Sequence, residues 1–287
     1  MSGLARYRRF YSEEIRAVAG LRSEALVQAL ATVPREAFLG PGPWQILSLN
    51  QALGEATYRP TPDDNPEHVY HNVAVAIDAS RQLNNGQPSA LAPAMDALNL
   101  RRGERAVHIG AGTGYYSAVL AEMVGPDGHL VAIEVDPALA ERARANLASR
   151  PWVRVVHGNA SELDGSFAGI LVNAGATHPR SQWLDALAPD GRLVLPLTAT
   201  LPGMPFPSGF FVNIRRGPNA YSVELISPIS IFNCEGARDE TVNAKLVQLL
   251  RQGGWKRIRS LRRDSHPEGD SCLVHTAQFC LSGVPSP

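Results

Sequence analysis

The sequence has little cysteine, no excess of charge of either sign and no long apolar run. Its three cysteines, Cys234, Cys272 and Cys280, are too few and too irregularly spaced to predict a disulfide framework or a zinc site, so no metal is expected. No apolar stretch approaches the roughly 20 residues that cross a bilayer, and the basic N-terminus lacks the apolar segment of a secretory signal. These absences predict a cytoplasmic protein with no membrane partner.

The charge balance excludes a further class of partner. The 27 lysine and arginine residues match the 27 aspartate and glutamate residues, so the formal net charge is zero. Proteins that coat nucleic acid need a basic surface that releases counterions, so no nucleic-acid partner is expected. We interpret the basic cluster near the C-terminus as a solvated strand face or a partner contact: Lys256, Arg257, Arg259, Arg262 and Arg263.

The first hundred residues predict helices and loops. A helical spacing of apolar residues ends at Pro34 and includes Leu21, Leu26, Leu30 and Val33. The segment from Tyr58 to His68 holds three prolines and is predicted to be a loop. A helix is expected from about Ser89 to Leu100, where Pro93 is awkward unless it falls in the first turn.

From Ala106 onward, short apolar strands alternate with helices. The five candidate strands are Ala106–Ile109, Leu130–Ile133, Val153–Val156, Gly169–Asn173 and Arg192–Pro196. Apolar runs of this kind favour strands buried on both faces, and therefore a mostly parallel sheet covered by helices. Asp136 is predicted to cap the helix after the second strand, with Pro137 in its first position. Two later runs flank Gly217 and Pro218, which predicts an antiparallel hairpin.

A glycine-rich loop carries the strongest functional signal. Gly110, Gly112 and Gly114 lie between a predicted strand and a predicted helix, where the backbone can turn sharply and approach a ligand. Glu134 follows Gly114 by 20 residues, at the end of the next strand, where a carboxylate can accept both ribose hydroxyls of an adenosine ligand. Dinucleotide sites use G-x-G-x-x-G, whereas this loop has Tyr115 at the third glycine position. The spacing favours a nucleoside ligand without a pyrophosphate, with S-adenosylmethionine the leading candidate.

Several segments follow one another in a fixed order: VPREAFLGP (Val33–Pro41), RRGERAVHIGAGTGYYSAVLAEMVG, VAIEVDPALAERARANL, VRVVHGNA, LAPDGRLVLPL and PISIF (Pro228–Phe232). In this order they resemble the class I S-adenosylmethionine-dependent methyltransferases, and more specifically the protein-L-isoaspartate (D-aspartate) O-methyltransferase family. The resemblance covers about Leu26 to Ile231. It implies a Rossmann-like α/β fold and methyl transfer to a carboxylate on a peptide or protein.

The resemblance also implies a set of cofactor residues. By position, the glycine loop would line the methionine end and the ribose, Glu134 would hold the ribose hydroxyls, and Asn159 would lie beside the adenine where the family usually has aspartate. Asn173 ends the fourth strand, at the edge of the sheet where ligands gather. The full predicted set is Gly110, Ala111, Gly112, Gly114, Tyr115, Glu134, Val135, Gly158, Asn159 and Asn173.

The chain departs from the family pattern at two further places. His108 stands two positions before the first loop glycine, where the family usually has an acidic residue. The family's substrate segment, roughly G-Q-T-I-S-Q-P, corresponds to QLNNGQP (Gln82–Pro88), so that Asn84 and Gly86 replace its hydroxyls. The predicted substrate residues are Asn84, Asn85, Gly86 and Gln87, although the same residues also read as an ordinary turn.

These departures leave the methyl acceptor open. A carboxylate is already ionised at neutral pH and needs no general base, so no catalytic residue is assigned. An alcohol or amine acceptor would need a base, for which His108 and His178 are the nearest candidates. The acceptor is therefore expected to be a peptide, a protein or a small-molecule acid, and an inactive methyltransferase-like binding module is the alternative outside enzymes.

The expected architecture combines these readings. It is a doubly wound, mostly parallel α/β sheet that ends in an antiparallel hairpin, with N-terminal helices. Residues 1–236 would form the methyltransferase domain, with the N-terminal helical and substrate segment in 1–100 and the cofactor-binding sheet in 101–236. Residues 237–287 would form a small C-terminal α/β extension, with a helix at about Asp239–Arg251, a basic strand in 255–263 and a strand at about Leu273–Leu281.

Overall fold

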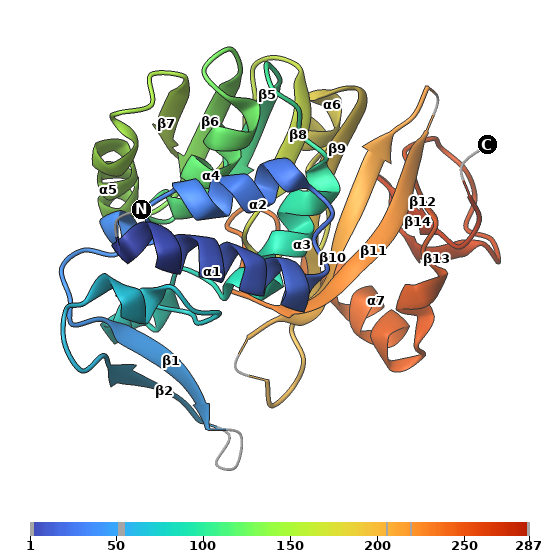
Figure 1. Ribbon diagram of the computed structural model, residues 1–287. Coiled ribbons are helices and arrows are strands. Elements are labelled where there is room, and N and C mark those ends of the chain that lie inside the picture. Colours follow the sequence, from blue (N-terminus) through green and yellow to red (C-terminus); the bar gives the residue numbers. More distant parts are fainter. Residues whose placement is uncertain (1–2, 51–54, 205, 219, 286–287) are drawn as a thin grey trace. The chain divides into compact units, whose positions relative to one another are not determined.

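The computed structural model describes residues 3–50, 55–204, 206–218 and 220–285, and the chain divides into two compact units (Figure 1). The first unit comprises the chain up to Asp96 together with Arg101–Gly103 and Ala111–His157. The second comprises Ala97–Leu100, Glu104–Gly110 and the chain from Gly158 onward. The division passes through the glycine loop and not through residue 236, so the C-terminal extension shares a unit with the strands that precede it.

Two helices open the first unit. Helices α1 (Gly3–Ala19) and α2 (Glu24–Thr32) lie side by side, in blue in Figure 1. The Ser23 hydroxyl caps α2 by accepting a hydrogen bond from the Leu26 N–H at 3.2 Å. Leu26 and Leu30 are fully buried, and the helix ends before Pro34. The predicted helix is confirmed, although Leu21 lies ahead of it.

A run of short elements follows. The 3-10 helices are η1 (Arg35–Phe38), η2 (Pro66–Val69) and η3 (Ala79–Arg81), and the strands are β1 (Gln45–Asn50), β2 (Glu55–Pro60), β3 (Ala76–Asp78) and β4 (Leu83–Asn84). Strands β1 and β2 pair antiparallel, so the prediction of a loop was wrong for Tyr58–Pro60. Pro60 is the last residue of a strand in a two-stranded sheet, a position where proline is tolerated. Strands β3 and β4 form a second antiparallel pair.

The rest of the first unit alternates helices and strands. Its elements are α3 (Pro88–Leu98, whose last two residues belong to the second unit), α4 (Tyr115–Val124), β6 (His129–Glu134), α5 (Pro137–Leu147) and β7 (Val153–His157). Pro93 lies inside α3, beyond the first turn in which it was expected. Strands β6 and β7 are parallel, as predicted. The predicted cap is confirmed, because the Asp136 carboxylate accepts hydrogen bonds from Ala138 and Leu139 N–H at 2.9 and 3.0 Å.

The second unit holds a mixed sheet with the strand order β5-β8-β9-β10-β11-β12-β14-β13. Strands β5 (Arg105–Ile109), β8 (Phe167–Val172) and β9 (Leu187–Ala199) are parallel, with the short helix α6 (Ser181–Asp185) between the last two. Strands β10 (Ser208–Arg216) and β11 (Tyr221–Ser230) form the predicted antiparallel hairpin, in orange in Figure 1. Every predicted strand from Ala106 to Pro196 is confirmed, with longer bounds for most of them.

The C-terminal extension continues this sheet and does not stand apart from it. Helix α7 (Glu240–Arg251) confirms the helix predicted at about Asp239–Arg251; Asp239 caps it, and the 3-10 helix η4 (Gly254–Arg257) follows. The predicted basic strand is confirmed only at β12 (Ser260–Arg262). The strand expected at Leu273–Leu281 is a hairpin of β13 (Cys272–His275) and β14 (Cys280–Ser282). Within the described residues, no helix combines the length and apolar character needed to cross a membrane.

The predicted basic cluster lies in this extension. Arg262 pairs with Asp264 and Arg263 pairs with Asp185, each at 2.5 Å between nitrogen and oxygen. The Arg259 guanidinium donates to the backbone carbonyls of Lys256 and Ile258. Local partners therefore take up several of these charges, in line with the reading as a solvated face.

Candidate functional site

The glycine loop and Glu134 meet in the first unit, as the spacing predicts. The Gly112 N–H donates to Glu134 Oε2 at 2.7 Å, and the Asp136 N–H donates to Glu134 Oε1 at 3.0 Å. Glu134 is the last residue of β6 and is 6% exposed. Each carboxylate oxygen still has capacity to accept another hydrogen bond, because an ionised carboxylate offers about four acceptor positions. The arrangement can therefore hold two hydroxyl donors without losing its own support.

Two loop glycines of this unit are required by the backbone. Gly112 and Gly114 have φ of 56° and 94°, a region that favours glycine. A Cβ at Gly114 would lie 3.0 Å from the Leu147 side chain, whereas one at Gly112 would have ordinary contact with Ile77. Gly114 therefore allows close packing of α5 against the start of α4, and Gly112 keeps its surroundings open.

Tyr115 begins α4 with its side chain turned into the core. It is 2% exposed, its hydroxyl lies 3.2 Å from the Tyr11 hydroxyl, and its ring makes an edge contact with Phe38. The Arg35 guanidinium lies over the same ring at 5.8 Å. This packing buries the Tyr115 side chain and leaves its backbone as the part next to the loop, while a cofactor contact by Tyr115 stays a prediction. Tyr116 is also buried, and its hydroxyl donates to the Gly86 carbonyl at 3.3 Å.

The predicted substrate residues form a turn that uses its own polar groups. The Asn84 side-chain oxygen accepts the Gly86 N–H at 2.9 Å, and its amide nitrogen donates to the Tyr58 hydroxyl at 3.1 Å. The Asn85 side-chain oxygen accepts from the Val75 N–H and from Arg35. The Gln87 carbonyl accepts from the first turn of α3. The Asn85 side-chain nitrogen is buried with no hydrogen-bond partner within the described residues, so it is an unsatisfied donor.

Gly86 explains why the family hydroxyl is missing here. Its φ is 78°, and a Cβ would lie 2.4 Å from Leu91 Cδ1. A serine in this conformation would be strained and would displace Leu91. The turn therefore has a backbone conformation in which a residue with a side chain is not tolerated at position 86 without movement of Leu91.

Arg35, from the VPRE segment, holds this turn in place and was not predicted as a site residue. It is fully buried, and its guanidinium donates to the carbonyls of Val69, His71 and Val73 at 2.7, 3.0 and 2.6 Å. It also donates to the Asn85 side chain at 3.3 Å. The VPRE motif was visible in the sequence, but the carbonyls that Arg35 binds lie more than 30 residues away along the chain.

The segment from Ile77 to Gly86 lies against the cofactor loop and its acid. Arg81 Nη1 is 2.5 Å from Asp136 Oδ2, and Arg142 donates to the Ile77 carbonyl at 3.0 Å. The Leu139 N–H and then Arg81 hold the pKa of the Asp136 carboxyl below its usual value. The predicted substrate turn and Glu134 therefore belong to one continuous region of the first unit.

Ala111 and Val135 also lie in the first unit, whereas Gly110, Gly158, Asn159 and Asn173 lie in the second. A Cβ at Gly110 (φ 81°) would lie 3.2 Å from the Asn173 carbonyl oxygen, so this position requires glycine. The Asn173 N–H donates to the Ile109 carbonyl at 2.8 Å, which places the start of the loop beside the end of β8. Gly158 has open space around it. The Asn159 side chain accepts from the Ser161 N–H, so one of its lone pairs is already in use.

The two histidines considered as bases have different surroundings. His108 lies on β5, is 0% exposed, and burial lowers its pKa to about 4. It is therefore neutral at pH 7 and cannot provide the charge of the family's acid. Burial also lowers the pKa of His178, whose ring accepts from or donates to the Thr177 hydroxyl at 2.9 Å and stacks on Phe279. Neither side chain is identified as a catalytic base by these contacts.

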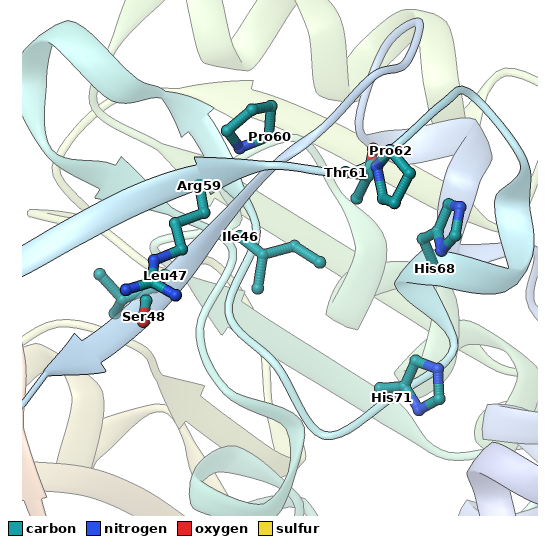
Figure 2. Close-up of a pocket in the computed structure, with 9 residues that line it drawn as sticks. All are labelled: Ile46, Leu47, Ser48, Arg59, Pro60, Thr61, Pro62, His68 and His71. Atoms are coloured by element: carbon teal, nitrogen blue, oxygen red, sulfur yellow. The ribbon is translucent and has the colours of Figure 1, made fainter.

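A separate hollow of about 360 Å³ lies between the β1–β2 hairpin and the segment around η2, within the first unit. Figure 2 shows its lining, with His68 and His71 at one end and Leu47, Ser48 and Arg59 at the other. Its remaining walls are Ile46, Pro60, Thr61 and Pro62. None of the predicted cofactor or substrate residues lines it, so the hollow is distinct from the Glu134 region.

Comparison with known sequences agrees with the resemblance. A sequence profile described as protein-L-isoaspartate(D-aspartate) O-methyltransferase matches residues 55–202, which is just over half of the chain. A protein-L-isoaspartate O-methyltransferase from Methylorubrum populi is 33% identical over 215 residues, which cover 74% of this chain and 86% of that protein.

Two solved structures share the fold. One, a protein-L-isoaspartate O-methyltransferase, has a TM-score of 0.64 at 20% identity and covers 85% of this chain and 69% of its own. The other, from Plasmodium falciparum in complex with S-adenosyl-L-homocysteine, has a TM-score of 0.58 at 14% identity, with coverages of 79% and 98%. At these identities the likeness shows the fold alone, and it confirms the predicted α/β methyltransferase fold.

Proposed function

Because the chain belongs to the protein-L-isoaspartate(D-aspartate) O-methyltransferase family, we propose that it transfers a methyl group from S-adenosylmethionine to a carboxylate on a peptide or protein. The observation that carries the cofactor assignment is the bonding of Glu134. Its two oxygens are fixed by the N–H groups of Gly112 and Asp136 and still have lone pairs for the ribose hydroxyls.

The remaining cofactor contacts follow from position. In the first unit, the predicted contacts either belong to the glycine loop or adjoin Glu134 in the sequence. They are Ala111, Gly112, Gly114, Val135 and the backbone of Tyr115. In the second unit, Gly110, Gly158, Asn159 and Asn173 stay predictions from the family pattern, with Asn159 offering its amide to the adenine. The cofactor supplies an activated methyl group on a sulfonium, and the chain supplies the alignment.

The acceptor needs orientation more than proton transfer. A carboxylate is ionised at neutral pH, so the attacking oxygen requires no base. Positioning of two reactants is a large source of rate acceleration, and buried donors that hold one carboxylate oxygen direct the other. The Asn85 side-chain nitrogen is such a donor, because it is buried and its own oxygen is fixed by Val75 and Arg35.

The cofactor assignment is tested by calorimetric titration with S-adenosylhomocysteine. We expect Glu134→Ala to weaken binding at least tenfold, about 1.4 kcal/mol, because the ribose hydroxyls lose their acceptors. Glu141→Ala is the matched control, since Glu141 is an exposed carboxylate on α5 in the same unit. Unchanged affinity in a folded Glu134→Ala variant would contradict the assignment. Absence of binding by the folded wild type would favour the methyltransferase-like binding module.

The acceptor is tested separately with paired peptides. Transfer to an isoaspartyl peptide over its normal aspartyl twin would support repair chemistry of the kind named for the family. The turn at Asn84–Gly86 lacks the hydroxyls of the family pattern and favours a second candidate acceptor, a different peptide or a small-molecule acid. If the protein binds the cofactor and methylates another acceptor, with equally negligible transfer to both peptides, that candidate is selected. If it binds the cofactor and methylates no acceptor, the binding module is selected.

A further inference from the structure

Four side chains with nitrogen or sulfur donors converge in the C-terminal extension, far in sequence from the predicted cofactor and substrate residues. His266, Cys272, His275 and Cys280 each present one ligand atom, and these four atoms all lie within 4.8 Å of one another. Three of the residues are partly buried and Cys280 is fully buried. Counting cysteines alone hides this group, because half of its members are histidines.

The hairpin geometry brings three of the four to one face. His275 on β13 is directly opposite Cys280 on β14. Cys272 and His275 are three residues apart, so in a regular strand their side chains would point to opposite faces. The pairing shifts by one residue between Cys272 and Val274, which inserts Leu273 as an extra residue. This bulge returns Cys272 to the face of His275.

The separation of Cys272 and His266 matches a four-coordinate metal. The Cys272 sulfur lies 3.6 Å from His266 Nε2. A tetrahedral Zn²⁺ with its usual Zn–S and Zn–N bond lengths places neighbouring sulfur and nitrogen ligands about 3.6 Å apart. The rings of His266 and His275 are 4.9 Å apart and nearly perpendicular, which lets both face a common point.

Neighbouring groups orient the ligands. His266 Nδ1 is 2.9 Å from the Asp264 carbonyl and 3.3 Å from its carboxylate, so an N–H there leaves the Nε2 lone pair directed at Cys272. This is the outer-shell support that metal-binding histidines usually have. The Gly269 N–H donates to the Cys272 sulfur at 3.4 Å. His275 Nδ1 is buried with no hydrogen-bond partner within the described residues, a deficit that a metal ion would remove.

We propose that His266, Cys272, His275 and Cys280 bind one Zn²⁺ ion in a structural site. Two sulfur and two nitrogen ligands suit zinc and not the oxygen-binding cations Mg²⁺ and Ca²⁺. Four protein ligands leave no open position for a substrate, so the ion ties the 263–271 loop to the β13–β14 hairpin. Binding deprotonates the two thiols and releases their protons to the solvent. The proposal is independent of the methyltransferase assignment.

The test uses the full chain under reducing conditions, stripped of metal and titrated with Co²⁺. We expect one equivalent to give the intense visible bands of tetrahedral cobalt with thiolate ligands, and one equivalent of Zn²⁺ to abolish them. His266→Ala, which changes a loop residue, should weaken binding more than about 100-fold, beyond the 10- to 100-fold typical of losses in the outer shell. Asp264→Ala should weaken it about tenfold. Cys234→Ser is the matched control, since Cys234 is a buried cysteine of the same unit outside the cluster.

Three outcomes would overturn the proposal. The first is a folded wild type with three free thiols that binds neither Co²⁺ nor Zn²⁺ at micromolar concentration. The second is a cobalt spectrum typical of octahedral oxygen coordination, which needs no variant and therefore decides the matter even if a variant does not fold. The third is bound metal whose affinity is the same in His266→Ala and Cys234→Ser, which would place the ion elsewhere.

Discussion

The cofactor loop and the predicted substrate turn are neighbours in the first unit, yet they use their polar groups in opposite ways. Around Glu134 the structural hydrogen bonds come from backbone N–H groups, and the carboxylate keeps lone pairs for a ligand. In the turn, the Asn84 and Asn85 side chains themselves make the structural bonds. These bonds occupy the oxygens of both side chains and leave the Asn85 side-chain nitrogen as a remaining donor, so the loop retains more binding capacity than the turn does.

This contrast separates cofactor binding from acceptor recognition, two properties that the family normally combines. The loop and Glu134 follow the family's spacing, and Glu134 keeps lone pairs for the ligand proposed there. In the turn, Gly86 has a φ of 78° and a Cβ there would lie 2.4 Å from Leu91 Cδ1, so a serine at this position would be strained. We therefore expect cofactor binding to follow the family and acceptor choice to depart from it.

The largest expected effect comes from removing the support of the turn. Arg35→Met leaves the buried carbonyls of Val69, His71 and Val73 without their charged donor, and each such loss costs about 1–3 kcal/mol. We expect the free energy of unfolding to fall by about 3 kcal/mol or more in urea titrations. Arg142→Met is the control, because Arg142 is partly exposed and donates to the single carbonyl of Ile77. Equal losses in the two variants would show that Arg35 has no special role.

Much of this architecture could be predicted from local patterns. The strands around the glycine loop, the Asp136 cap and the distance from Gly114 to Glu134 all depend on residues close in sequence, where periodicity and capping rules apply. The β1–β2 hairpin escaped prediction because three prolines between Tyr58 and His68 outweighed the strand at Glu55–Pro60.

The parts that could not be predicted depend on contacts between distant residues. Arg35 binds carbonyls 34 to 38 residues away, and the inward packing of Tyr115 depends on Tyr11, 104 residues earlier. The extra residue in the β13–β14 pairing, which aligns Cys272 with His275, depends on cross-strand register that no spacing rule shows. Tertiary packing decided each of these cases.

A second prediction examines His108, a departure from the family pattern on the cofactor side. His108 is fully buried with its pKa lowered to about 4, whereas an unfolded histidine has a pKa near 6.5. Between these two pH values the unfolded chain binds about one more proton than the folded chain does. The contribution of His108 to the unfolding free energy is therefore full above pH 6.5 and falls as the pH is lowered. From pH 7.5 to pH 5 this residue alone should remove about 2 kcal/mol of unfolding free energy.

The measurement is a urea titration at both pH values for the wild type and for His108→Leu. The variant should lose about 2 kcal/mol less than the wild type over the same interval, since its other titrating groups are unchanged. An identical pH dependence would mean that the histidine is accessible to protons in the folded state. In that case His108 could be positively charged near neutral pH, where the family has an acidic residue. It would then affect cofactor binding through that positive charge.

The smallest expected change in stability comes from substitution of Asn84, which tests the choice of acceptor while leaving the fold almost unchanged. Asn84→Thr restores a family hydroxyl, and threonine can still accept the Gly86 N–H, although the donor to the Tyr58 hydroxyl is lost. We expect a stability change below about 1 kcal/mol and no change in S-adenosylhomocysteine affinity. Asn84→Ala removes both bonds and supplies no hydroxyl, so it is the matched control.

The two variants should differ in their use of an isoaspartyl peptide. A hydroxyl that donates to a carboxylate contributes on the order of 1.5 kcal/mol, which corresponds to about a tenfold change in kcat/KM. If the turn still receives an isoaspartyl carboxylate, Asn84→Thr will exceed Asn84→Ala by about that factor. Equal values for the two variants would mean that the acceptor does not reach Asn84. The turn at Asn84–Gly86 would then be a structural element, and the acceptor would have to be sought against other surfaces of the molecule.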